Sequence, residues 1–150
     1  MKRLVLALIA CCLIAGCSLF GSDDCGEREG LFIQTDRQSY RVGEEATLTV
    51  KNCTGETAFY DEGGGIVQYD LEKKINSTWE IFDEQGGGLY SFLEEIESGK
   101  QVELSLPVEP ERDRMDMVMG VYRYELDIRN SEEDFVSQER RRSNTFEVTE

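Results

Sequence analysis

Thiols and carboxylates are the side chains in this sequence that could take part in catalysis, metal binding or covalent modification. The 150 residues contain five cysteines and 31 Asp plus Glu, against 16 Lys plus Arg, and no histidine. Without histidine, His-based catalytic triads and His-containing metal motifs are excluded, and the usual general base near neutral pH is missing. The formal net charge of −15 would repel phosphate backbones, so we expect no nucleic-acid binding. Thiol and carboxylate chemistry are what this composition leaves open.

Cys17 stands at the end of a short N-terminal segment that is unlike the rest of the chain. Lys2 and Arg3 give it a positive start, and residues 4–13 form an uncharged apolar run. A helix over that run would span only about 15 Å, half of a hydrocarbon core, which is too short for a stable membrane anchor. The pattern is typical of a secretory signal. Residues 14–17, Ile-Ala-Gly-Cys, resemble the lipobox of bacterial lipoproteins.

This resemblance implies that signal peptidase cleaves before Cys17, whose thiol carries a diacylglycerol. Residues 1–16 would then be the lipoprotein signal peptide, and Cys11 and Cys12 would be removed with it. Two or more acyl chains hold a protein to a bilayer durably. In double-membraned bacteria the residue after the lipidated cysteine influences sorting in this family, and Ser18 favours the outer membrane over inner-membrane retention. The alternatives are an ordinary cleaved signal with an incidental cysteine, or a single-pass anchor.

Cys25 and Cys53 are the thiols that remain if Cys17 is lipidated. An exported, oxidising compartment favours a disulfide between them. A turn at residues 40–43 would pair antiparallel residues whose numbers sum to about 83, which sets Gly30 opposite Cys53 with Cys25 a few residues beyond. Two free cysteines are the alternative. A metal or redox site is not expected, because the CxxC spacing and histidine partners are both missing.

The part of the chain that follows the N-terminal segment is predicted to consist of a short tether and an all-β domain. Residues 17–30 form the lipidated N-terminus and linker, and residues 31–150 form one domain. Apolar and polar residues alternate with a period of two, which indicates half-buried strands separated by Gly, Asn and Pro. Residues 89–96 are the one brief helical candidate. About eight strands in an antiparallel sandwich are expected, near residues 31–36, 46–52, 56–60, 66–72, 78–82, 101–106, 119–129 and 143–149.

A series of weak motifs resembles the immunoglobulin-like β-sandwich domains of bacterial secreted and lipid-anchored proteins. The resemblance implies a tyrosine corner at Gly120 and Tyr122, in which the phenol bonds to the chain upstream. Tyr124 occupies the place of the second immunoglobulin cysteine, so the antibody-type inter-sheet disulfide is absent. The sandwich of the intracellular proteinase inhibitor family is a weaker resemblance. The motifs are Tyr40, Gly43-Glu44, Leu71-Glu72-Lys73, Trp79, Gly120-Val121-Tyr122-Arg123 and Phe146-Glu147-Val148.

Acidic clusters are the remaining candidate sites. Carboxylates at Glu109, Glu111, Asp113 and Asp116 could supply oxygen ligands to Ca²⁺, but interleaved arginines and the lack of an Asp-x-Asp-x-Asp-Gly motif favour a solvated loop. The glycine runs at 63–65 and 86–88 lack the Lys and helix of a phosphate-binding loop. Residues 140–142, three arginines, are the only basic run. We expect them to pair with neighbouring acids or to discourage edge pairing near the last strand.

Taken together, the sequence predicts a lipid-anchored envelope protein that acts as a non-catalytic binding or structural module. Its partners would be the membrane, through the N-terminal anchor, and an envelope protein bound by loops or by an exposed sheet edge. No cofactor or metal is expected. An envelope protease inhibitor is one alternative. A carboxylate-dependent hydrolase is another, and would need a pocket in which two acids with perturbed pKa values converge.

Overall fold

The computed structural model describes residues 25–63, 66–85, 91–108, 119–130, 134 and 136–149. The predicted signal peptide, Cys17 and the tether up to residue 24 lie outside these residues. The acidic connection that holds Glu109, Glu111, Asp113 and Asp116 lies outside them too. The predictions for these segments therefore stay predictions.

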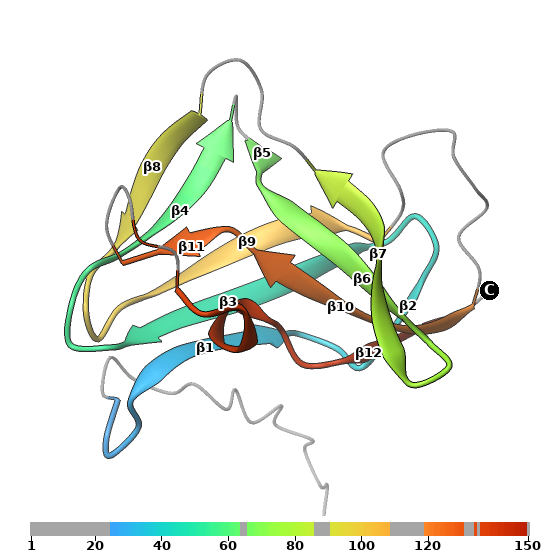
Figure 1. Ribbon diagram of the computed structural model, residues 1–150, viewed down its shortest axis with the longest axis horizontal. Coiled ribbons are helices and arrows are strands. Elements are labelled where there is room, and N and C mark those ends of the chain that lie inside the picture. The colour runs from blue at the N-terminus through green and yellow to red at the C-terminus, as the bar shows by residue number, and fades with distance from the viewer. Residues whose placement is uncertain are drawn as a thin grey trace, which may run out of the picture.

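The first sheet has the strand order β1-β3-β9, and its strands are antiparallel (Figure 1). β1 spans Gly30–Thr35, β3 spans Glu45–Cys53 and β9 spans Gln101–Pro107. Gly30 pairs with Cys53, which confirms the register predicted from the turn. That turn also contains β2 (Ser39–Arg41), a short strand that was not predicted and that joins the second sheet.

The second sheet has the order β2-β12-β10-β6-β7. Its neighbours are antiparallel except for β2 and β12, which run parallel. Asn76 and Ser77 join β6 to β7 with φ of 48° and 74°, the left-handed conformations that a two-residue hairpin requires. The further strands of this sheet are β6 (Tyr69–Ile75), β7 (Thr78–Gln85), β10 (Gly120–Leu126) and β12 (Phe146–Thr149).

A third sheet, of four strands, includes most of the segment 89–96 that was only a brief helical candidate in the sequence. Ser91–Ile96 is strand β8 and pairs antiparallel with β4, Ala58–Gly63. Leu and Glu are good helix formers, but intrinsic propensity is a weak determinant, and pairing that buries Ile96 against Ala58 overrides it. β5 (Ile66–Val67) and β11 (Ile128–Arg129) also pair with β4.

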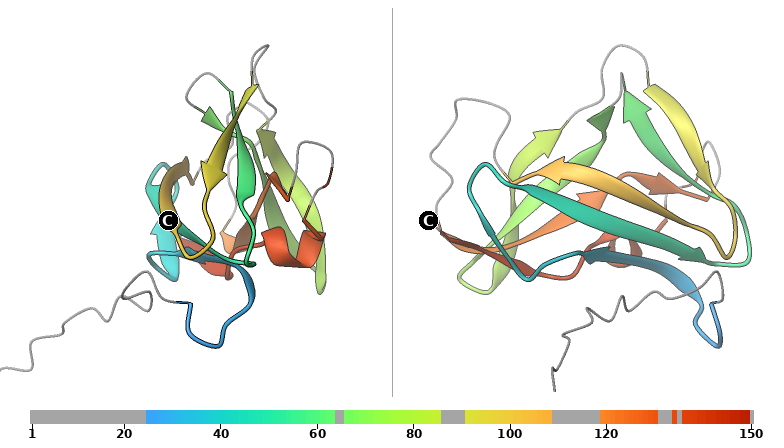
Figure 2. Two further views of the ribbon diagram at one scale, coloured as in Figure 1. Left: turned by 90° about the vertical axis from the view of Figure 1, so that its left-hand side faces the viewer. Right: turned by 180° about the vertical axis from the view of Figure 1, so that it is seen from behind.

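One hydrophobic core lies between the first two sheets (Figure 2). Leu48 and Leu106 from the first sheet meet Leu71, Tyr124 and Phe146 from the second, and all five side chains are at most 2% exposed. The prediction of an all-β, antiparallel fold is confirmed. The described residues form twelve strands rather than eight, because the predicted segments 66–72 and 119–129 are each interrupted and β2 and β8 are additional.

Candidate functional site

Two of those interruptions meet at one point of the fold. β5 and β6 are separated at Gln68, and β10 and β11 at Asp127. The Gln68 N–H donates to the Asp61 carbonyl (3.0 Å), the Asp127 N–H to Gln68 (3.3 Å) and the Asp61 N–H to Asp127 (3.4 Å). This closed ring of main-chain hydrogen bonds joins the second sheet to the third. It also fixes the place where a carboxylate-lined pocket opens.

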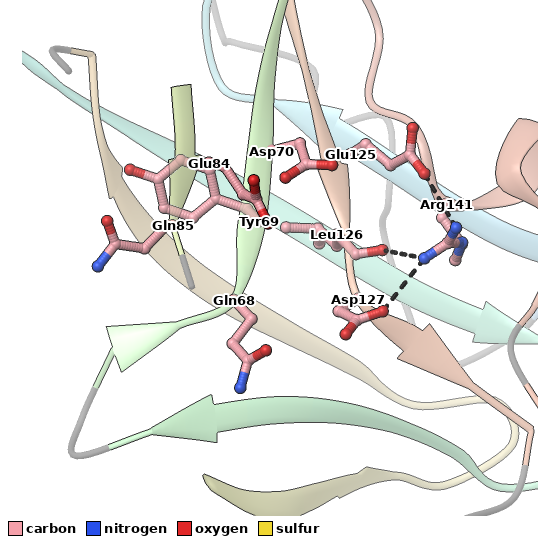
Figure 3. Close-up of a pocket in the computed structure, with 9 residues that line it drawn as sticks. All are labelled: Gln68, Tyr69, Asp70, Glu84, Gln85, Glu125, Leu126, Asp127 and Arg141. Carbon is pink, nitrogen blue, oxygen red and sulfur yellow. Dashed lines mark hydrogen bonds and ion pairs between the residues drawn. The ribbon is translucent and has the colours of Figure 1, made fainter. Parts of the chain in front are cut away.

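The pocket beside this junction has a volume of about 190 Å³ (Figure 3). The guanidinium of Arg141 spans one wall, where it donates to Glu125 (2.9 Å), to Asp127 (3.2 Å) and to the carbonyl of Leu126 (3.5 Å). Carboxylates and amides dominate the lining, so the pocket is polar. The lining residues are Gln68, Tyr69, Asp70, Glu84, Gln85, Glu125, Leu126, Asp127 and Arg141.

Four arginines and four carboxylates form one alternating series of ion pairs that runs past this pocket, which we call the ion-pair chain. Each of the inner members contacts two partners of opposite charge. The N···O distances in order are Arg123–Glu72 2.5 Å, Glu72–Arg142 3.0 Å, Arg142–Glu125 3.2 Å, Glu125–Arg141 2.9 Å, Arg141–Asp127 3.2 Å, Asp127–Arg129 3.7 Å and Arg129–Asp61 2.5 Å.

The strands and one short helix position this chain. Arg123 and Glu72 are directly opposite each other on β10 and β6. The 3-10 helix Gln138–Arg141 and the bridge from Arg142 to Glu125 bring two arginines of the basic run onto the sheet. The prediction that this run pairs with acids is confirmed. The side chains of Glu72 and Glu125 are only 5% and 6% exposed, so their charges depend on these partners.

The Asp70 carboxyl, like that of Glu84, has no hydrogen bond or ion pair within the described part of the chain. Asp70 lies opposite Glu84 on β7 and opposite Glu125 on β10. Burial, reinforced by the negative charges of Glu84, Glu125, Glu72 and Asp127, raises the pKa of Asp70 to about 6. Burial also raises the pKa of Asp127, against the opposing effect of Arg129. The pocket can therefore hold a proton close to neutral pH.

Replacing Asp70 by asparagine is expected to stabilise the protein at neutral pH. The folded chain holds a proton at Asp70 up to about pH 6, whereas an unfolded aspartate loses it near 3.9, so the stability contributed here falls as pH rises between these values. Solvent screening keeps the gain of Asp70→Asn to about 1 kcal/mol at pH 7.5. Urea unfolding measures it.

The gain should shrink as the pH falls toward 4 and vanish below the unfolded pKa of about 3.9, where the parent carboxyl is protonated in both states. Glu97→Gln, at an exposed turn, is the control and should change the unfolding free energy equally little at both pH values. An Asp70→Asn variant that is no more stable than the parent at pH 7.5 would contradict the raised pKa.

The predicted disulfide is present in the structure. Cys25 and Cys53 are bonded, with their Cα atoms 5.7 Å apart. Next to the bond, the fully buried Asn52 donates to the carbonyls of Glu56 and Ile96 (2.7 Å each) and so ties the end of β3 to β4 and β8. The bond therefore fastens residue 25 to a firmly held corner of the body.

The predicted tyrosine corner residues lie at the start of β10. Gly120 packs under the Lys73 side chain, and a Cβ at this glycine would come within 3.1 Å of Lys73 Cε. The Tyr122 ring is fully buried and stacks on Phe146. The phenol that the structure shows bonded to an upstream carbonyl is that of Tyr124, which donates to Pro107 at 2.9 Å. The corner role of Tyr122 stays a prediction.

A second cavity, of about 460 Å³, lies between the free side of β9 and the second and third sheets. It is near Pro107, at the opposite end of β9 from the Cys53 corner. Five of its ten lining residues are leucine, valine or tyrosine. Gln85 is 7% exposed there, and its side-chain oxygen has no hydrogen-bond partner among the residues that the structure describes.

Sequence reasoning did not find the ion-pair chain, Asp70 or this cavity. The alternation of apolar and polar residues indicates that Asp70, Glu72 and Glu125 lie on the solvent side of their strands, but it does not indicate which side chains lie next to them. Within the described ranges, no cluster of His, Cys, Asp or Glu is arranged to hold a metal ion. Nor does any helix there have the length and apolar character needed to cross a membrane.

No family model matches this sequence, and no curated protein matches it. Two solved structures are similar in part. One is the alkylpurine DNA glycosylase AlkC of Pseudomonas fluorescens bound to DNA with an abasic site analog, at 10% identity and a TM-score of 0.41, covering 82% of this chain and 31% of that one. The other is the sporulation control protein Spo0M of Bacillus subtilis, at 15% identity and a TM-score of 0.34, covering 81% and 49%. The chain thus spans less than half of either protein, and neither likeness assigns a family or a function.

Proposed function

We propose that this protein is a bacterial lipoprotein in which acylated Cys17 fastens a non-catalytic binding module to the cell envelope, on the outer membrane where the host has one. The observation that carries the proposal is the Cys25–Cys53 disulfide. Stable disulfides are formed by exported proteins and are rare in reducing compartments, so the bond supports the secretory interpretation of the N-terminal segment. The lipobox-like residues 14–17 then supply the means of attachment. The all-β body is consistent with the immunoglobulin-like resemblance of the sequence.

The position of the disulfide also orients the body in this proposal. Only residues 18–24 separate Cys17 from the bonded Cys25, and these span at most about 25 Å. The corner at Cys53 would therefore lie close to the bilayer. The cavity of about 460 Å³ near Pro107 is at the other end of β9, roughly 20 Å further along the strand. It would face away from the membrane, where a partner can reach it.

Cys17→Ala is expected to abolish membrane attachment. The parent should incorporate labelled palmitate, fractionate with membranes and give an intact mass that begins at Cys17 with acyl groups added. The variant has no thiol for the thioether, so it should take up no label. Cys11→Ala, within the predicted signal peptide, is the matched control and should behave as the parent. Recovery of the unmodified full-length parent from the aqueous fraction would contradict the proposal.

A carboxylate-dependent hydrolase is the second candidate, and the polar pocket favours it. Asp70 and Glu84 are directly opposite each other, and the pKa of Asp70 is raised to about 6, within the range of a general acid. Glu125 and Asp127, the other carboxylates of the pocket, are held by Arg141. The Asp70→Asn variant separates the two functions, because it would abolish hydrolysis but leave partner binding unchanged at the larger cavity, which Asp70 does not line.

A further inference from the structure

The larger cavity runs along the edge of a strand. Five consecutive residues of β9, Glu103–Pro107, line it. Successive side chains of a strand point to opposite faces, so a cavity on one face would touch only alternate residues. Contact with all five means that the cavity borders the main chain of β9 at its free side. No strand in the described part of the chain pairs with β9 on that side.

The hydrogen-bond pattern identifies which main-chain groups point into the cavity. The Val108 N–H donates to the Glu44 carbonyl across the sheet (2.8 Å). In an antiparallel pair the hydrogen-bonding direction alternates along the strand, so the main-chain N–H and C=O groups of Leu106 and Leu104 also point toward β3. Ser105 and Glu103 therefore direct their N–H and C=O groups away from β3, toward the cavity.

The lining of the cavity suits an apolar side chain. Leu104 and Leu106 of β9, at most 7% exposed, line it together with Val67 of β5 and Tyr69 of β6. Gln85 is opposite Tyr69 in the β6–β7 pair, and Figure 3 shows both side chains extending away from Glu125 and Arg141. A side-chain oxygen without a partner in the described structure is thus placed at the wall of the cavity, where a main-chain N–H of a ligand can donate to it.

The rim of the cavity is acidic, since Glu62 and Glu103 both contribute to it. With the formal net charge of −15, the rim disfavours a second copy of this chain and favours a cationic occupant. We propose that the edge of β9 at Glu103 and Ser105 binds an extended, basic peptide segment of a partner protein by strand addition. Its alternate apolar side chains enter the cavity and its lysines or arginines meet the rim. The inference names the partner class for the binding module proposed above.

The probe is a hexapeptide of alternating lysine and valine with blocked ends. The target is the full chain, which is purified in a nonionic detergent so that acylated and non-acylated protein can both be used. Amide hydrogen exchange at Glu103 and Ser105 is expected to slow by about tenfold or more on peptide addition. Ser105→Pro removes an N–H that the β3 ladder does not use, so it should fold and weaken binding about tenfold or more. Ser105→Ala keeps that N–H, so its loss of binding should be much smaller than that of Ser105→Pro.

Charge and main-chain controls complete the test. Glu103→Lys should weaken binding of the lysine–valine peptide, and a glutamate–valine peptide should not bind. A probe N-methylated at alternate residues cannot form the ladder and should also fail. Equal binding of the N-methylated probe, no slowing of exchange at Glu103 and Ser105, or no binding of the lysine–valine peptide would overturn the proposal. This test does not need acylated protein. A failure of the lipoprotein proposal would therefore show in the Cys17→Ala experiment and not in peptide binding.

Discussion

Replacing Glu125 by alanine is expected to lower the free energy of unfolding by about 3–5 kcal/mol. Glu125 is the carboxylate shared by Arg141 and Arg142, and it also accepts a hydrogen bond from Gln138 (2.9 Å). Both arginine side chains are at most 20% exposed, and the variant would leave each with one carboxylate, Asp127 or Glu72, instead of two. The cost arises mainly because two largely buried cations would each lose one of their two partners beside an emptied position. Denaturant unfolding with parent and variant measures it.

An exposed ion pair provides the control for this prediction. Glu44 contacts Arg37 at 3.2 Å, but the two side chains are 37% and 46% exposed. Glu44→Gln should therefore change the free energy of unfolding far less than Glu125→Ala does. If Glu125→Ala were as mild as Glu44→Gln, the ion-pair chain would not contribute to stability in the way its burial indicates.

Removing the disulfide is the second large effect that we expect. The bond joins residues 28 positions apart, and the chain entropy it removes from the unfolded state corresponds to about 3.5 kcal/mol. A Cys25→Ala/Cys53→Ala double variant should lose stability of this order in urea unfolding. Residues 25–29 precede β1, so amide exchange in that segment should also become faster.

A reducing agent provides an internal control for the same prediction. It should shift the unfolding midpoint of the parent down to that of the double variant, and should leave the double variant unchanged. An unchanged midpoint in parent protein whose two thiols have become alkylatable would show that the bond does not constrain the unfolded chain.

Local features of this fold could be predicted from the sequence because short turns fix them. The turn near residue 42 determines the register that sets Gly30 opposite Cys53, and the disulfide follows from that register. The segment of β8 was only a helical candidate in the sequence, because Leu93, Glu94 and Glu95 suit a helix and pairing with the distant strand β4 decides its conformation. β2 was missed because three residues carry too little periodicity.

The candidate sites depend on contacts between distant segments. Arg142 and Glu72 are 70 residues apart, and Arg129 and Asp61 are 68 apart. Alternation indicates that such side chains lie on the wet face of a strand, but it contains no information on which strand lies beside it. The raised pKa of Asp70 likewise arises from Glu84 and Glu125 on neighbouring strands. Strand order, rather than residue type, creates both sites.

The bond between Cys25 and Cys53 also determines how the molecule would bear mechanical load. A pull on the tether is transmitted through the sulfur atoms to the end of β3 and bypasses β1. β3 is the central strand of its sheet, held by β1 on one side and β9 on the other. Tension between the bilayer and a partner at the far end of β9 would run along these strands, so their hydrogen bonds would be sheared together instead of being peeled apart one by one.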